Sequence, residues 1–297
     1  MSELSSFIIV MAFIVVCILI ICLAIIMPSV QYKRSLYYKA THKPYSEIRY
    51  NKGTRGEYHM YLWAKFMEND GARFLFNCYL PKDNDETTEI DMIMIHTSGI
   101  YVFESKNYSG WIFGNEYDKE WTQTLPGRKG VSKEHFLNPI MQNKNHIDCL
   151  EKCISENIPI YSMVVFSDKC DFKQVKVLSS NTYVVKQSWL RGYLSSNVAR
   201  VGYVLSPELI ESIYTKLFPY TQVSDYEKAK HVYDIKFKQY VNEVNNTPKI
   251  GSDGTLYCPW CNGKLILRTT QRGPYAGSQF YGCSNFPKCK YMKTDRS

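Results

Sequence analysis

The sequence predicts an α/β domain, with an α+β arrangement as the alternative, in which helices flank a mixed sheet. Residues 88–110 contain two apolar, β-branched stretches separated by turn residues, which is typical of a hairpin. Residues 158–166 have the composition of a buried strand. Apolar residues recur at helical spacing before the hairpin, over residues 53–69, and after it, over residues 138–155. This order of helix, strands, helix and strand predicts the mixed sheet.

The hairpin carries a candidate set of charged residues. Its first strand is TEIDMIMI, its turn is Thr97-Ser98-Gly99, and its second strand is IYVFESK. Because side chains alternate across a strand, Glu104 and Lys106 share one face. Asp91 lies on the partner strand, and a twisted or bulged hairpin would bring its carboxylate near Glu104.

An Asp and a Glu that converge with a Lys suit metal-assisted cleavage of a phosphodiester. Carboxylates hold Mg²⁺ or Mn²⁺, and the metal polarises the phosphate and lowers the pKa of a bound water. The Lys would orient that water or offset charge that develops on phosphorus. The alternative is an ordinary hairpin in which Glu104 and Lys106 lie on a solvated charged face.

Two flanking helices carry further candidates. Glu57 lies in the first turn of the helix expected over residues 53–69, where a carboxylate is also stabilised by the helix dipole without any catalytic role. Gln142 lies in the helix that begins at Asn138-Pro139.

These motifs occur in a recognisable order over residues 51–166. They are Gly56-Glu57, Glu89-Ile90-Asp91, the stretch GIYVFESKN followed by Ser109-Gly110, Asn138-Pro139, and Gln142. The order resembles the nuclease-related domain (NERD) family, which is placed among the PD-(D/E)xK nucleases. No Pro-Asp pair precedes the second strand, and Glu replaces the second Asp of that pattern.

The resemblance implies a role for each matching residue. Asp91 and Glu104 would be ligands of a catalytic Mg²⁺ or Mn²⁺, Lys106 the catalytic lysine, and Glu57 a further acidic residue. Gln142 would help to position metal or phosphate. The expected function is therefore a magnesium-dependent deoxyribonuclease. The alternative is a non-catalytic DNA-binding or scaffold protein on the same fold.

The amino-terminal region predicts a membrane anchor. Residues 7–27 carry no charged side chain, and a helix of that length spans about 30 Å, the thickness of the hydrocarbon core. A cleaved signal peptide is the alternative, but the first six residues contain no Lys or Arg, and no small-x-small cleavage site follows. We expect a single transmembrane helix over residues 7–28.

Basic residues predict the orientation of this helix. Lys33, Arg34, Lys39 and Lys43 follow the apolar stretch, and none precedes it. The positive-inside rule then places residues 1–6 outside the cell membrane and the rest of this single-pass chain in the cytoplasm. Residues 29–50 are expected to form a juxtamembrane connector.

The remaining composition favours an anionic partner. The 297 residues carry a formal net charge of +8, with a pI near 8.8, so nucleic acid and an anionic membrane surface are both candidates. The predicted nuclease-like domain covers residues 51–218. Residues 219–253 are rich in Lys and acidic residues and predict a helical or flexible linker.

Residues 254–297 predict a zinc module. Cys258 and Cys261 form one CxxC pair, and Cys283 and Cys289 follow after a 21-residue interval. Four thiolates match a tetrahedral structural Zn²⁺ site, which so small a module needs for stability. Disulfides are the alternative, which the expected cytoplasmic location disfavours.

The stretches CPWCNGKLILR and FYGCSNFPKC resemble the zinc ribbon of bacterial type IA topoisomerases. The resemblance implies binding of DNA, single-stranded or branched, although such ribbons also bind proteins. Some of the aromatic residues must pack around the metal instead, so we expect at most half of them to contact DNA. The candidate stacking residues are Tyr275, Phe280, Tyr281, Phe286 and Tyr291, and the candidate phosphate contacts are Arg268, Arg272, Lys288 and Lys290.

The charge asymmetry around residues 7–28 makes a testable prediction. A carboxyl-terminal fusion to alkaline phosphatase, which is active only after export, should be inactive, because the carboxyl terminus is expected in the cytoplasm. A fusion to a cytoplasmic reporter should be active. The opposite pair of results would reverse the orientation.

Overall fold

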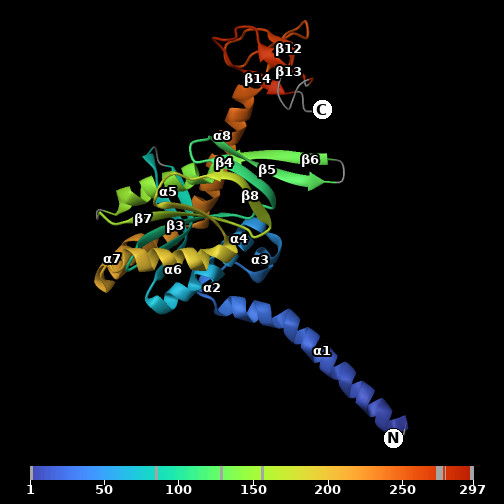
Figure 1. Cartoon of the computed structure of the whole chain (residues 1–297), viewed down its shortest axis with the longest axis vertical. Helices are drawn as coiled ribbons and strands as arrows, with labels where there is room; N and C mark the ends of the chain where they lie inside the picture. The colour runs from blue at the N-terminus through green and yellow to red at the C-terminus, as the bar shows by residue number, and fades with distance from the viewer. Residues whose placement is uncertain are drawn as a thin grey trace. The chain divides into compact units, whose positions relative to one another are not determined.

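The computed structural model describes residues 3–83, 86–127, 130–154, 157–271, 277 and 279–294. The chain divides into two compact units, Met1–Val223 and Ser224–Ser297 (Figure 1).

A five-stranded mixed sheet forms the centre of the first unit. Its strands are β1 (Arg73–Pro81), β2 (Thr87–His96), β3 (Gly99–Lys106), β7 (Ile160–Phe166) and β9 (Thr182–Lys186), in the order β1-β2-β3-β7-β9. The first three are antiparallel, and β3, β7 and β9 are parallel. The predicted hairpin and mixed sheet are confirmed. Gly99 has a φ of +131°, and a Cβ there would lie 2.5 Å from the Pro159 carbonyl oxygen, so the turn requires glycine.

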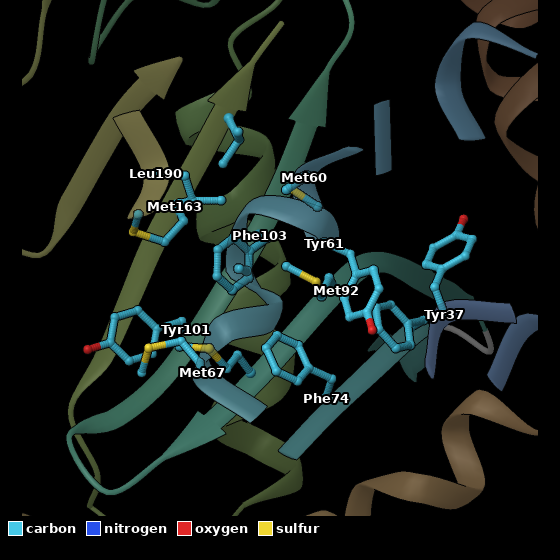
Figure 2. Close-up of a cluster of buried hydrophobic side chains, with 14 of the residues drawn as sticks. Tyr37, Met60, Tyr61, Met67, Phe74, Met92, Tyr101, Phe103, Met163 and Leu190 are labelled. Carbon is cyan, nitrogen blue, oxygen red and sulfur yellow. The ribbon is translucent and has the colours of Figure 1, made fainter. Parts of the chain in front are cut away.

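Helices cover both faces of this sheet (Figure 1). One face packs against α4 (Lys52–Ala64), the 3-10 helix η1 (Lys65–Asp70) and α6 (Leu190–Val201). The other packs against α5 (Pro139–Cys153) and α7 (Pro207–Leu217). The side chains of β3 alternate between the two resulting cores, with Tyr101 and Phe103 in the first and Ile100 and Val102 in the second. Figure 2 shows the first core, in which aromatic and methionine side chains interlock.

A second sheet of four strands follows the order β6-β5-β4-β8. Its strands are β4 (Gly110–Asn115), β5 (Glu120–Gly127), β6 (Gly130–Leu137) and β8 (Cys170–Lys176). Trp121 is fully buried and stacks on Phe166 of the first sheet, with ring centroids 6.1 Å apart. This contact joins the two sheets in one core. Two short 3-10 helices, η3 (Gln187–Trp189) and η4 (Phe218–Thr221), complete the unit.

The first helix, α1 (Glu3–Arg34), is long and apolar enough to cross a membrane. Its candidate span, Met11–Arg34, has a mean hydropathy of 3.1, and its apolar side chains are exposed. Pro28 lies inside the helix, which continues for six further residues.

The residues expected to form a juxtamembrane connector contribute side chains to the first core. They form α2 (Leu36–Thr41) and α3 (Tyr45–Tyr50). Tyr32, at the end of α1, and Tyr37, on α2, are both fully buried in the first core. The ring of Tyr32 packs 5.0 Å from that of Tyr58, and the ring of Tyr37 packs 5.1 Å from that of Phe76. The sequence did not reveal this packing role, because tyrosine residues are also common at a membrane interface.

The second unit begins with α8 (Asp225–Asn246) and ends in a small β module. The module contains β10 (Lys249–Ile250), β11 (Leu256–Tyr257), β12 (Leu265–Thr269), β13 (Gln279–Cys283) and β14 (Met292–Thr294). The last three form an antiparallel sheet. Its buried side chains are few: Cys258, Leu265, Cys283 and Tyr291. So small a core needs another source of stability.

Candidate functional site

The candidate carboxylates lie where the β2–β3 hairpin diverges. Its paired register ends at Met92 and Phe103, and the next position on each strand carries Asp91 and Glu104. Asp91 Oδ2 accepts a hydrogen bond of 2.8 Å from the Ser105 N–H, so this carboxylate turns toward β3. Desolvation, with the negative charges of Glu104 and Glu57, raises the pKa of Asp91 well above its ordinary value.

An irregularity in β1 accompanies this divergence. Phe76 and Met92 are paired and lie in the first core, whereas Cys78 and Ile90, also paired, lie in the second. The alternation of β1 side chains between the two faces of the sheet is therefore broken at Asn77, whose φ is +48°. Asparagine tolerates this left-handed conformation better than most residues. The Asn77 side chain donates to Glu57 Oε2 at 3.4 Å and to Glu89 Oε1 at 3.2 Å.

Glu104 and Lys106 form a buried ion pair on the face that α5 covers. Lys106 Nζ lies 2.5 Å from Glu104 Oε1 and donates to Gln142 Oε1 at 2.9 Å. Glu104 is only 3% exposed, so the alternative of a solvated charged face is wrong for this residue. Burial by itself would raise the pKa of Glu104, but the Lys106 charge and a hydrogen bond from His146 lower it overall. Burial would lower the pKa of Lys106, yet Glu104 raises it, so both groups stay charged.

His146 is a member of the site that the sequence analysis missed. Its Nε2 lies 3.3 Å from Glu104 Oε2, and its Nδ1 lies 2.7 Å from the Thr88 hydroxyl. His146 follows Gln142 by four residues, so both face the sheet from consecutive turns of α5. The four-residue spacing between Gln142 and His146 is the signal in the sequence that could have identified His146. Glu104 thus has Lys106 on one oxygen and His146 on the other.

Glu57 approaches from the opposite face, on α4. A Cβ at the preceding Gly56 would lie 2.8 Å from the Ser105 hydroxyl, so only glycine lets this helix come so close to the end of β3. Asn51 caps α4 through hydrogen bonds to the Gly53 and Thr54 N–H groups. The Glu57 carboxylate instead binds side chains: the Tyr37 hydroxyl at 2.8 Å, Lys43 Nζ at 3.2 Å and Asn77 Nδ2 at 3.4 Å. Glu57 is the sixth residue of α4, past its first turn, so its predicted position in the first turn is wrong and the helix dipole does not explain it. Its carboxylate is held by these three side chains instead.

The three carboxylates are of the chemical type that binds a divalent cation. Asp91, Glu104 and Glu57 present carboxylate oxygens, the ligands that Mg²⁺ and Mn²⁺ prefer, and their mutual repulsion raises the pKa of Asp91. Among the described residues, the oxygens of these carboxylates do not form a cluster as close as that of the cysteine sulfurs in the second unit. Those four sulfurs all lie within 4.8 Å of one another. Of the two neighbouring carboxylates, Glu104 acts more strongly than Glu57 on Asp91.

The second unit carries the cysteine cluster. Cys258 Sγ lies 3.7 Å from Cys289 Sγ, and Cys261 Sγ lies 3.3 Å from Cys283 Sγ. Ligands about 2.3 Å from a tetrahedral zinc ion are separated by close to these distances. The Asn285 N–H and side-chain amide point toward Cys283 Sγ and Cys261 Sγ at 3.4 and 3.5 Å, as donors that would stabilise thiolates. The geometry and donor set support structural Zn²⁺.

One face of the three-stranded sheet gathers several predicted DNA contacts. Arg268 and Phe280 are paired across β12 and β13, and the Arg268 guanidinium lies 5.9 Å from the ring of Phe286, which is 59% exposed. Tyr281 packs against the small core, as does Tyr291, which is 5% exposed. Lys288 and Lys290 are exposed, whereas Arg272 and Tyr275 lie outside the described residues. Trp260, 60% exposed in the first CxxC pair, is an aromatic candidate that the sequence analysis overlooked.

Comparison with known proteins agrees with this division. Residues 52–167 match the model of the nuclease-related domain, and residues 256–297 match that of the topoisomerase DNA-binding C4 zinc finger. An uncharacterised protein of Bacillus anthracis is 34% identical over 145 residues, which cover 49% of this chain and 66% of that protein. No solved structure matches the chain.

The carboxyl-terminal unit also matches two enzymes named DNA topoisomerase 1. The one from Mycoplasma genitalium is 53% identical, and the one from Methanocaldococcus jannaschii 56% identical, each over 36 residues. Those residues are 12% of this chain but only 5% and 4% of the two enzymes. The likeness therefore concerns the ribbon alone.

The cysteine geometry predicts one zinc ion per chain and a metal-dependent fold for the ribbon. Changing Cys283 to Ser should remove the ion and unfold the module, because metal binding contributes on the order of 10 kcal/mol to folding in small zinc modules. Metal analysis and limited proteolysis would measure both effects. Changing Cys170, which is buried in the first unit, to Ser should leave the zinc content unchanged. A zinc-free ribbon that resists proteolysis would contradict this assignment.

Proposed function

Since residues 52–167 form a nuclease-related domain and residues 256–297 a C4 zinc ribbon, we propose that the protein is a membrane-anchored, metal-dependent nuclease that hydrolyses DNA. The observation that carries the proposal is the buried Glu104–Lys106 pair beside Asp91. Keeping two charges desolvated is costly, and a surface hairpin has no need of it. Perturbed ionisable groups of this kind are concentrated at functional sites.

The proposed chemistry assigns the metal to Asp91 and Glu104. Mg²⁺ or Mn²⁺ bound there would polarise the scissile phosphate and activate a water. The chain itself supplies Lys106, whose ammonium is held in place by Glu104 and Gln142 and stabilises negative charge that develops on phosphorus. His146 holds the second oxygen of Glu104 and so fixes the orientation of that carboxylate.

The ribbon would hold the DNA strand. Arg268, Phe280 and Phe286 place a cation and two aromatic rings close together, a combination that suits stacked bases and phosphates of single-stranded or branched DNA. The net charge of +8 favours the same partner. We place both units at the cytoplasmic face of the cell membrane, with α1 as the anchor.

A second hypothesis is a tethered DNA-binding or scaffold protein whose nuclease fold does not cut. The ribbon supports it as well as it supports the nuclease. The intact set of Asp91, Glu104 and Lys106 favours the enzyme, because binding alone does not require such a cluster of ionisable groups with perturbed pKa values.

Catalysis can be tested with the full chain in detergent. It should cut DNA with Mg²⁺ or Mn²⁺, and EDTA should stop the reaction. Glu104→Gln removes a ligand charge and Lys106→Met removes the ammonium, so each should lower the rate by about 10²-fold or more. Glu211→Gln and Lys152→Met alter exposed ion pairs and serve as matched controls.

The substrates should include single-stranded, duplex and branched DNA alongside RNA. Variants of Glu104 and Lys106 that cut as fast as the two surface controls would show that this site is not catalytic. A parent chain that binds DNA but cuts none of these substrates with either metal would favour the tethered binding protein.

DNA binding by the ribbon can be measured separately by fluorescence anisotropy in EDTA-free buffer without Mg²⁺. Phe286→Ala should weaken binding of single-stranded DNA by about 1–3 kcal/mol, the usual effect of losing one stacked base. Lys288→Gln should make the affinity less sensitive to salt, because one phosphate contact is lost. Ile250→Ala, at a side chain 73% exposed on β10, is the control. Equal affinity for all three variants and the parent would move the DNA site elsewhere.

A further inference from the structure

The juxtamembrane segment contacts a candidate catalytic carboxylate directly. Three donors converge on a single oxygen, Oε2 of Glu57, and two of them, Tyr37 and Lys43, come from the residues immediately after α1. The third is Asn77, at the irregularity in β1. Within the part of the chain that the structure describes, Glu57 Oε1 has no hydrogen-bond partner.

Both donors are held rigidly. The Tyr37 ring is fully buried and lies beside that of Tyr61, as Figure 2 shows. Lys43 is fixed through its backbone, because the Tyr32 hydroxyl at the end of α1 donates to the Lys43 carbonyl oxygen at 2.7 Å. Its ammonium is partly shielded, since the side chain is 23% exposed. The anchor helix, the segment that follows it and Glu57 therefore form one connected structure.

We propose that Tyr37 and Lys43 are positioning residues that complete the nuclease site, so that the membrane anchor is a structural part of the site as well as a tether. They hold Glu57 through Oε2, whereas Oε1 accepts no hydrogen bond from the described residues. Glu57 then acts as the outer carboxylate of the metal-binding set. This inference rests on the proposed nuclease function.

A purely structural role makes a different prediction. If Tyr37 and Lys43 only filled the core and neutralised Glu57, their loss would lower stability and leave metal affinity unchanged. If they position Glu57, their loss weakens metal binding and lowers kcat, whereas the KM for DNA stays the same because the ribbon is untouched.

The test uses the full chain, loaded with zinc and reconstituted in lipid nanodiscs. Tyr37→Phe keeps the buried ring and removes only the hydroxyl, and Lys43→Met keeps the apolar stem and removes the charge. Tyr38→Phe and Lys39→Met, on the same helix, are matched controls. Mn²⁺ affinity is measured by calorimetry without DNA, and kcat and KM with an oligonucleotide.

We expect Tyr37→Phe and Lys43→Met each to weaken Mn²⁺ binding and to lower kcat roughly tenfold, the scale of one hydrogen bond to a charged group. Lys43→Arg should restore most of both, and the controls should match the parent. Variants with the Mn²⁺ affinity of the controls would overturn the proposal, as would a parent that binds no Mn²⁺. If Tyr37→Phe lowers the melting temperature, the comparison of Lys43→Met with Lys43→Arg decides.

The two proposals fail differently. A parent that binds Mn²⁺ but does not cut would contradict the nuclease function alone, and the Mn²⁺ affinities of the variants would still test the positioning of Glu57. Normal cutting by Tyr37→Phe and Lys43→Met would contradict the positioning role alone.

Discussion

The buried ion pair of Glu104 and Lys106 is the constraint around which the first unit is arranged. Two charges at the end of β3 lie beneath α5, where Glu104 is buried and the Lys106 side chain is only 15% exposed, so each needs protein partners. Glu104 obtains them from Lys106 and His146, and Lys106 from Glu104 and Gln142. Removing either charge would leave the other buried without its counterpart. The position of α5 on the sheet therefore depends on the contacts of Gln142 and His146 with Lys106 and Glu104.

A second constraint acts on the opposite face of the sheet. Gly56 lets α4 approach the end of β3, and the following Glu57 then reaches the edge where Asp91 lies. The partly buried Glu57 carboxylate requires donors, and two of them come from the segment after α1. The aromatic cluster around Tyr32 and Tyr37 holds that segment in place through extensive apolar burial. Tyr37 therefore both packs in the first core and helps to hold Glu57 in place.

The two units are stabilised by different means. The first buries two cores on either side of a five-stranded sheet, which is enough apolar surface to fold without a metal. Among the described residues of its β module, the second unit has a hydrophobic core of Cys258, Leu265, Cys283 and Tyr291, and its four sulfurs converge at distances suited to zinc. In the described part of this module, Trp260, Phe286, Lys288 and Lys290 remain exposed on the surface.

Local patterns in the sequence determined the long apolar first helix, the β2–β3 hairpin, the mixed sheet and the four cysteines of the ribbon. Each of these depends on side-chain periodicity or on the spacing of neighbouring residues, which a sequence displays directly. Only the tertiary structure decided that Glu104 is buried, that His146 contacts it, and that Tyr37 and Lys43 bind Glu57. Those contacts join residues between 14 and 42 positions apart, across helices and strands whose packing sets which polar groups lose water. Local propensity carries no information on such desolvation, because it arises from the assembled core.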